Sequence, residues 1–214
     1  MKFLFITLLG IGLFLSPGSQ QVWEALSGRR TFTHAEQSLI LAADTLTPMR
    51  VLLITDRADS LVLRRKSRPI AADPTDPVLQ HMVRRLYRTV RDSMTLGVGI
   101  AAPQVGILRK IIWVQRFDKE HFPFEVYLNP VIKWYSPETQ PCPEGCLSIP
   151  DRRETLNIRA ARIAIEYDTM TGTHLRDTVS GFTAVIFQHE IDHLSGILYI
   201  DHLQAEIRSA RRQP

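Results

Sequence analysis

Cysteine is scarce in this chain of 214 residues, which contains only Cys142 and Cys146. Two cysteines cannot form the disulfide framework that stabilises many small secreted proteins. We therefore consider whether a cysteine of this pair binds a metal ion through its thiolate.

The chain also lacks internal repeats, low-complexity tracts and long runs of one charge. Its formal net charge is +4, but the basic residues stand in short scattered groups without interleaved aromatic residues. This pattern is typical of solvated surface charge and does not indicate a specific nucleic-acid partner. With 44% hydrophobic residues, the chain can bury one core of good size.

One apolar run stands near the N-terminus, at residues 3–15, after Met1-Lys2 and before a Ser-Pro-Gly-Ser group. The run is shorter than the roughly 20 residues of a typical membrane-spanning helix. It predicts a signal or membrane-targeting segment at residues 1–25, with a membrane tether through residues 3–15. No A-x-A cleavage site is present, so an ordinary N-terminal strand or helix is the alternative. Residues 26–48 are expected to be a linker or accessory segment, ahead of a catalytic domain at 49–214.

The clearest helix signal begins at Asp76-Pro77, an N-cap residue followed by proline at the first helical position. Apolar residues then recur on one face through Met94, and Gly97 marks the end. The same signals predict a second helix at residues 181–193, ended by a glycine.

Short apolar or alternating runs between polar and proline-bearing links predict strands. They are expected at residues 51–55, 111–114, 126–129, 131–135, 163–167 and 174–179. A Thr-Met-Thr-Gly group at 169–172 predicts a hairpin between the last two. The order of helix, strands and helix favours an α+β fold with antiparallel sheet over a βαβ repeat.

The second predicted helix contains the motif H-E-x-x-H, with His189, Glu190 and His193. Histidines at i and i+4 lie on one face of a helix and can bind one metal ion, while Glu190 can take a proton from an activated water. A solvent-exposed helix face could contain the same H-E-x-x-H pattern by chance. The apolar residues 184–187 before the motif instead predict a buried helix, where such groups would be costly without a metal.

A third ligand is required, and Cys146 in the segment E-G-C-L-S-I-P is the best candidate, because a thiolate is a strong ligand. Cys142 is the competitor. If both cysteines bound together with both histidines, the result would be a closed structural zinc site in a binding module. The prolines that flank Cys142, the long gap between the two pairs and the presence of Glu190 argue against that arrangement.

The third conspicuous segment is G-V-G-I-A-A-P-Q-V-G at residues 97–106. A dinucleotide-binding turn is excluded, because these glycines follow a helix and the third glycine of that motif is missing. Small residues let a ligand or another backbone approach closely. A tight turn would explain the glycines but not Gln104.

Together the segments GVGIAAPQ, EGCLS and QHEIDHLSG resemble the peptide deformylase family, whose pattern is G-x-G-x-A-A-x-Q, E-G-C-L-S and Q-H-E-x-D-H-L-x-G in the same order. The resemblance covers residues 49–203. This family removes the formyl group from the N-terminal methionine of newly made polypeptides. It implies antiparallel sheets packed around a central metal-binding helix.

The resemblance also implies the roles of the site residues. Metal ligands would be Cys146, His189 and His193, the general acid and base Glu190, and the oxyanion donors Gln104 and the backbone N–H of Leu147. The implied ion is most often Fe(II), and Zn, Ni or Co can take its place. An H-E-x-x-H zinc peptidase remains the alternative enzyme, although it needs neither Gln104 nor Cys146.

The implied substrate is a formyl-methionyl peptide, with ribosome-associated nascent chains as its source. It would pair in extended form with the edge at residues 97–99 and place its methionine side chain in an apolar pocket. The substrate-binding residues are expected to be Gly97, Val98, Gly99, Glu144, Phe182, Val185 and Ile186. The family resemblance favours the cytoplasm, whereas the N-terminal segment favours export or membrane attachment.

Overall fold

The computed structural model describes residues 31–92 and 97–212. The predicted targeting segment at 1–25, the start of the predicted linker and Met94 lie outside the described residues. Within the described ranges, no helix is long and apolar enough to cross a membrane.

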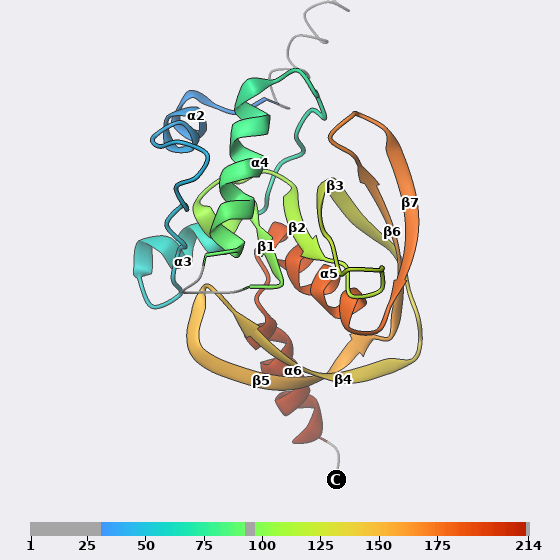
Figure 1. Cartoon of the computed structure of the whole chain (residues 1–214). Coiled ribbons are helices and arrows are strands. Elements are labelled where there is room, and N and C mark those ends of the chain that lie inside the picture. Colours follow the sequence, from blue (N-terminus) through green and yellow to red (C-terminus); the bar gives the residue numbers. More distant parts are fainter. Residues whose placement is uncertain (1–30, 93–96, 213–214) are drawn as a thin grey trace, which may run out of the picture.

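The described elements are shown in Figure 1. The helices are α2 (His34–Ile40), α3 (Arg57–Leu63), α4 (Pro77–Val90), the short 3-10 helix η1 (Ala102–Val105), α5 (Gly181–Leu194) and α6 (Tyr199–Ala210). The strands are β1 (Gly99–Ala101), β2 (Ile111–Gln115), β3 (Phe124–Tyr135), β4 (Thr139–Cys146), β5 (Ile149–Ala160), β6 (Arg162–Asp168) and β7 (His174–Ser180).

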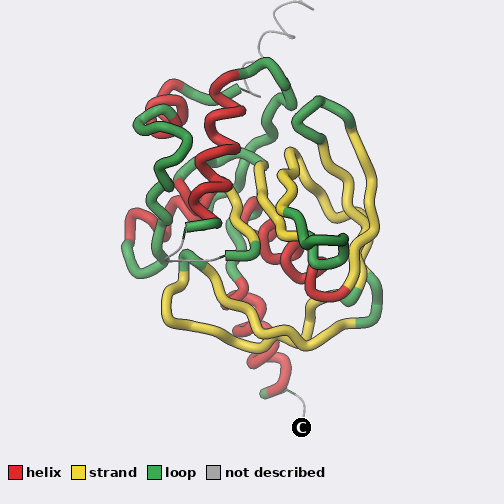
Figure 2. Tube along the Cα trace, in the orientation of Figure 1, coloured by secondary structure: helices red, strands yellow, loops and turns green. Residues whose placement is uncertain are grey.

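The strands form two antiparallel sheets around helix α5. One sheet has the order β1-β2-β3-β6-β7, and β4 and β5 form a separate long hairpin. Figure 2 shows that hairpin on the opposite side of the central helix from most of the larger sheet. Helix α5 contacts all seven strands. The predicted α+β class with antiparallel sheets is therefore confirmed.

Helix α4 forms where its sequence predicts a helix. The Asp76 side chain accepts hydrogen bonds from the N–H groups of Val78 and Leu79, and Pro77 occupies the first turn. Its apolar face is buried, but the helix ends at Val90. The N–H of Gly97 donates to the carbonyl of Val90, so the chain closes back on the helix end.

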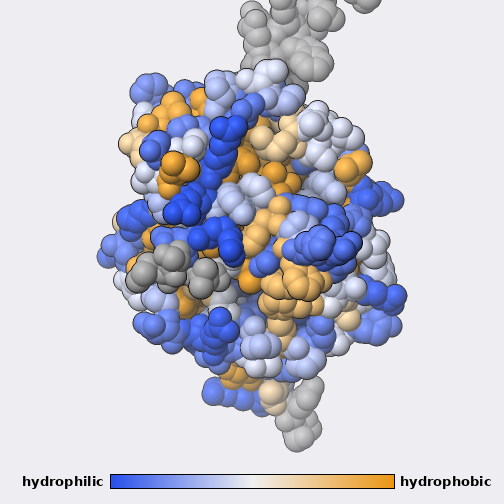
Figure 3. Space-filling view, viewed as in Figure 1, coloured by the Kyte–Doolittle hydropathy of each residue, from blue (hydrophilic) through white to orange (hydrophobic). Residues whose placement is uncertain are grey.

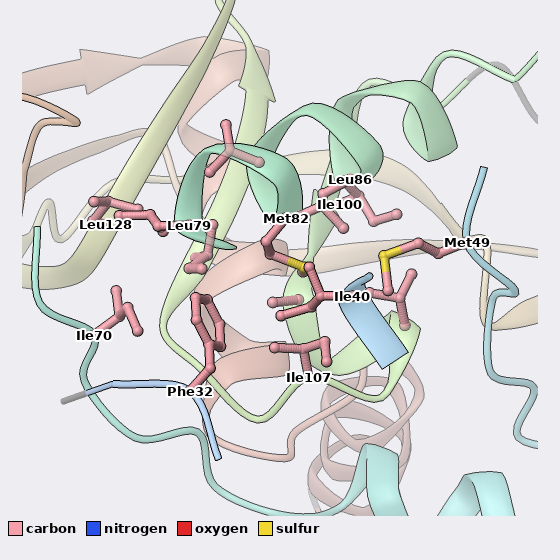
Figure 4. Packing of buried hydrophobic residues seen from close by; sticks show 14 of the residues in the cluster. Phe32, Ile40, Met49, Ile70, Leu79, Met82, Leu86, Ile100, Ile107 and Leu128 are labelled. Carbon is pink, nitrogen blue, oxygen red and sulfur yellow. The ribbon is translucent and has the colours of Figure 1, made fainter. Parts of the chain in front are cut away.

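One cluster of buried apolar residues packs between α4, strand residues and the segment before residue 49, where the predicted catalytic domain begins. Phe32, just before the short helix α2, and Ile40, the last residue of that helix, lie with Leu79 and Met82 of α4 in this cluster (Figure 4). Residues 31–48 therefore include a helix that is docked on the core. The exact domain boundary at residue 49 stays a prediction.

The predicted strand at residues 51–55 is wrong, because this segment bonds to two separate parts of the chain instead of one neighbouring strand. The N–H of Leu52 donates to the carbonyl of Gln104 at 2.7 Å. The N–H of Ile54 donates to the carbonyl of Ser148 at 2.9 Å. The segment therefore ties η1 to the turn between β4 and β5.

The other predicted strands and the second predicted helix are confirmed, with 126–129 and 131–135 joined in β3. The β4–β5 hairpin and helices α3 and α6 are additional to the prediction. Strand β4 contains Pro141 and Pro143, which sequence rules read as strand breakers. They are tolerated here because β4 pairs with only one neighbour.

Candidate active site

Helix α5 places the two histidines of the H-E-x-x-H motif on one buried face. His189 and His193 stand one turn apart with ring centroids 5.0 Å from each other, and they are 9% and 1% exposed. Burial lowers the pKa of His193 well below its ordinary value. A neutral imidazole is the form that binds a metal ion.

Cys146, at the end of β4, completes a three-residue cluster. Its Sγ lies 3.2 Å from Nε2 of His193, and the potential ligand atoms of Cys146, His189 and His193 all lie within 4.8 Å of one another. One thiolate and two imidazoles suit a divalent transition metal and leave a coordination position for water. The residues present therefore fit a catalytic metal ion.

Cys142 is not part of this cluster. It is buried, and its Sγ lies 3.8 Å from the carbonyl oxygen of Pro143. The four-ligand zinc site that would use both cysteines therefore has no support among the described residues.

Glu144 orients the first histidine. Nδ1 of His189 lies 2.7 Å from Oε2 of Glu144, and Arg159 donates two hydrogen bonds to the same carboxylate at 2.7 and 3.0 Å. Burial would raise the pKa of Glu144, but its hydrogen bonds with His189 and Arg159 lower it to about 2. With Nδ1 engaged by an ionised carboxylate, Nε2 of His189 is left for the metal.

The polar network continues outward from Arg159, which the sequence alone does not connect with the site. Arg159 also donates to Oδ2 of Asp192 at 2.7 Å, and Nε2 of His202 on α6 lies 2.9 Å from the same oxygen. Arg159 is only 3% exposed. A chain of hydrogen-bonded polar groups therefore connects α6 to His189.

Glu190 faces the cluster from α5 and is 4% exposed. Its Oε2 atom is buried without a hydrogen-bond partner among the described residues. Burial raises the pKa of this carboxyl to about 7. A carboxyl with a pKa near neutrality can both accept and donate a proton.

Gln104 lies on η1 and is 2% exposed. Its Oε1 accepts the N–H of Ala101 at 2.8 Å, which turns the amide nitrogen toward the cluster. That nitrogen lies 3.5 Å from Sγ of Cys146 and 3.3 Å from Oγ of Ser148. Ser148, fully buried, is a site neighbour that belongs to the EGCLS motif but received no predicted role.

A cleft of about 900 Å³ opens over this cluster. Eleven of the thirteen predicted site residues line it: Gly97, Val98, Gly99, Gln104, Glu144, Cys146, Leu147, Phe182, Ile186, His189 and Glu190. His193 and Val185 do not line it and are 1% and 2% exposed. The structure thus brings together nearly all of the predicted residues, and only Val185 has no place at the cluster or in the cleft wall.

Gly99 forms the wall of the cleft nearest to Glu190. A Cβ atom at this position would lie 2.5 Å from Oε1 of Glu190 and 2.8 Å from Cγ2 of Ile186. Only glycine lets the β1 backbone approach the carboxyl this closely.

Matches to known proteins agree with this geometry. A family model described as polypeptide deformylase matches residues 50–209. The chain belongs to the peptide deformylase family. The match begins after α2, so that helix precedes the part that the family model describes.

Curated members of the family have similar sequences. A peptide deformylase from Caulobacter sp. (strain K31) is 34% identical over 173 residues, covering 76% of this chain and 96% of the relative. A peptide deformylase from Bartonella quintana is 38% identical over 144 residues, covering 66% and 78%. These matches confirm the resemblance drawn from the three motifs.

Solved deformylase structures share the fold. A class I type b peptide deformylase from Acinetobacter baumannii with bound Met-Ala-Ser superposes with a TM-score of 0.64 at 31% identity, covering 73% of this chain and 98% of that one. The peptide deformylase from Thermotoga maritima gives a TM-score of 0.63 at 32% identity, covering 73% and 97%. This chain therefore matches nearly the whole length of both of these solved structures.

Proposed function

We propose that the cluster on α5 and β4 carries out the metal-dependent deformylation that is the activity of this family. In that reaction the formyl group is removed from the N-terminal methionine of a polypeptide. The observation that carries the proposal is the convergence of Cys146, His189 and His193 beside a buried carboxyl, Glu190.

Cys146 and the two histidines would hold one divalent ion, with Fe(II) as the proposed ion in cells and Zn, Ni or Co as substitutes. When bound, the ion supplies Lewis acidity and lowers the pKa of a coordinated water from its bulk value toward about 7. The ionised Glu144 and Arg159 beside it would keep the His189 ring in place.

Glu190 would move the proton. Its carboxyl is buried beside the histidines, and its Oε2 atom is free of hydrogen bonds among the described residues. We propose that it takes a proton from the attacking water and gives it to the leaving amine. Such proton transfer typically contributes a factor of 10²–10⁴ in rate.

Gln104 and the backbone N–H of Leu147 would bind the oxyanion of the tetrahedral intermediate. The Gln104 amide is held by the N–H of Ala101, so its nitrogen is oriented before substrate arrives. A preoriented donor stabilises charge as it develops, and loss of one typically costs about 10²–10³ in kcat.

The substrate peptide would pair with the backbone at residues 97–99 and place its methionine side chain against Phe182 and Ile186. Both side chains line the cleft next to Glu190. The relative from Acinetobacter baumannii was solved with Met-Ala-Ser, and one from Synechococcus elongatus with actinonin. A peptide that begins with methionine is thus the proposed ligand of this cleft too. Val185, buried outside the cleft wall, would support this pocket from behind.

The decisive experiment measures formate release from a formyl-methionyl peptide by anaerobically purified protein of known metal content. The unaltered chain should release formate. The Glu190→Ala variant should bind the same amount of metal and release formate at least 100-fold more slowly. Absence of formate with every ion tested would defeat the proposal.

A zinc peptidase is the second candidate, because it shares the H-E-x-x-H motif. The buried Gln104 amide and the Cys146 ligand favour the deformylase. A peptide whose N-terminus is blocked by a group other than formyl distinguishes the two enzymes, because only the peptidase would cut its internal bonds.

We further propose that nascent chains are the source of substrate and that residues 1–25 direct the enzyme to a membrane or across it. The support for the second point is the apolar run at residues 3–15 after a basic start. Cell fractionation combined with N-terminal sequencing tests it. An intact N-terminus with all the activity in the cytosolic fraction would contradict it.

A further inference from the structure

The first turn of helix α6 packs beside the ligand cluster. The ring of Tyr199, the first residue of α6, stacks on the imidazole of His189, with ring centroids 5.9 Å apart and an angle of 25° between the ring planes. Tyr199 also belongs to a buried apolar cluster against which Cys146 packs. No residue of α6 lines the cleft. The start of α6 therefore lies against two of the three proposed ligands without facing the substrate.

The Tyr199 ring has a fixed place. It is 1% exposed, and its hydroxyl donates to the carbonyl oxygen of Arg152 at 3.1 Å. The fully buried Leu156 of β5 and the buried Leu198 belong to the same cluster. An aromatic ring held in this way restricts rotation of the stacked imidazole, because a turned imidazole would push its edge into the face of the tyrosine.

His202 lies one turn later on α6 and acts on the same imidazole through polar groups. Its Nε2 lies 2.9 Å from Oδ2 of Asp192, an oxygen that also accepts a hydrogen bond from Arg159 at 2.7 Å. Arg159 in turn binds the Glu144 carboxylate, which holds Nδ1 of His189. The buried guanidinium of Arg159 thus lies between two carboxylates, and the outer one is shared with His202. Loss of His202 would free Asp192 to rotate and would loosen Arg159 against Glu144.

The part of α6 that carries His202 does not belong to an apolar core. Only Tyr199 and Ile200 are buried on this helix, and the His202 side chain is 27% exposed. Figure 3 shows mixed hydrophilic and hydrophobic surface at the end of the molecule where α6 projects below the β4–β5 hairpin. The bond from His202 to Asp192 therefore contributes little to core packing, and its main effect falls on the polar network.

We infer that Tyr199 and His202 are positioning residues that hold the imidazole of His189 in the orientation needed to bind the metal ion. Tyr199 acts on the face of the ring, and His202 acts on its Nδ1 edge through the polar network. Neither side chain touches the substrate or the reacting atoms. This inference rests on the proposed function, because it takes His189 to be a metal ligand.

The first test measures metal affinity of the full chain by titrating Zn²⁺ or Co²⁺ against a competing chelator. His202→Ala should raise the dissociation constant by about 3- to 10-fold, less than the roughly 10- to 100-fold typical of a direct partner of a ligand. His202→Gln keeps an N–H donor and should bind metal like the unaltered chain. His174→Ala is the matched control, because it removes a similar bond, of 2.8 Å to Asp168, from the distant β6–β7 hairpin.

The second test records the visible absorption of bound Co²⁺, which reports the geometry of the ligands. At saturating Co²⁺, Tyr199→Leu should shift these bands, because the imidazole loses its stacked ring. Tyr199→Phe keeps the ring and should leave the bands unchanged. In the metal-saturated Tyr199→Leu and His202→Ala variants, kcat should fall while KM stays the same, because neither residue lines the cleft. Circular dichroism checks that each variant is folded.

Each failure has its own signature. An unchanged dissociation constant in His202→Ala, or an equal rise in His174→Ala, would overturn the role of His202. Unchanged Co²⁺ bands in Tyr199→Leu, or the same shift in Tyr199→Phe, would overturn the role of Tyr199. If Tyr199→Leu does not fold, the His202 variants decide the inference alone. An unaltered chain that binds metal tightly but releases no formate would defeat the proposed function instead.

Discussion

Glu144 and His189 are joined by a hydrogen bond of 2.7 Å between Oε2 and Nδ1, and Arg159 binds the same carboxylate from the other side. The two residues come from β4 and α5, so this bond connects the hairpin to the central helix. It fixes the orientation of the imidazole before any metal binds.

Glu144→Gln should weaken metal binding by about 10- to 100-fold, because the imidazole loses its ionised partner and becomes less basic. Titration with Zn²⁺ or Co²⁺ against a competing chelator measures the dissociation constant. Glu154→Gln is the control, since Glu154 lies on the same hairpin and pairs with the half-exposed Arg152. Equal metal affinity in the unaltered protein and in both variants would show that Glu144 does not orient His189 for metal binding.

Gly99→Ala should lower kcat by 10-fold or more while metal content stays unchanged. The added Cβ would lie 2.5 Å from Oε1 of Glu190, so the carboxyl must move away from its position at the cluster. Steady-state formate release and metal analysis on the same sample provide the measurement. Gly145→Ala is a suitable comparison, because its nearest neighbour is the flexible side chain of Arg153 at 3.1 Å. Unchanged kcat in Gly99→Ala would mean that Glu190 needs no fixed position.

Glu36→Gln should lower the free energy of unfolding by about 3–5 kcal/mol, because it removes the carboxylate charge that pairs with the buried guanidinium of Arg109. Arg109 is 0% exposed and donates to Glu36 from Nε and Nη2. Urea denaturation measures the change. Arg50→Gln, which breaks a pair whose arginine is largely exposed, should cost much less. A similar loss in both variants would contradict a special role for the buried pair.

The same pair should make stability depend on pH. Burial would raise the pKa of Glu36, but hydrogen bonds with Arg109 and Thr33 outweigh it and hold the pKa below the ordinary 4.5. The stabilisation from a lowered carboxyl pKa is complete above the unfolded-state value and is lost as pH falls through the folded-state value. Stability should thus fall below about pH 4.5, and less steeply in Glu36→Gln than in the unaltered chain. Denaturation curves at a series of acid pH values check this, and identical slopes would refute it.

Cys142→Ala should retain one metal ion per chain, whereas Cys146→Ala should lose it. Only Cys146 stands with His189 and His193 in the cluster, while the Cys142 thiol contacts a neighbouring carbonyl. Metal analysis after dialysis measures both. Loss of metal from the Cys142 variant, with the fold intact by circular dichroism, would revive the four-ligand zinc site.

The sequence predicts those elements whose formation depends on local patterns. Helix α4 has its cap at Asp76 and one apolar face, and α5 has its buried run before His189. The sequence of residues 51–55 also looks like a strand. In the structure, however, the N–H groups of Leu52 and Ile54 donate to the carbonyls of Gln104 and Ser148, far along the chain. Which partner an extended segment finds depends on the whole fold, so its short apolar run alone was insufficient to predict a strand.

The same distinction applies to the site. The three motifs predict that Cys146, Gln104 and the two histidines belong to one site. In the structure these residues lie close together. Arg159 has no motif of its own. It reaches Glu144 only because the register of β4 and β5 brings them to one face, and Asp192 only because α5 lies against that hairpin. Such partners depend on strand register, which the sequence does not specify locally.

The bonds that hold the active site together also set the moment at which the enzyme becomes active during its own synthesis. Gln104 to Cys146, Glu144 to His189 and Cys146 to His193 span 42, 45 and 47 residues of chain. None of these contacts can form until the later partner has left the ribosome. A product of translation that stops before His193 therefore has no complete site.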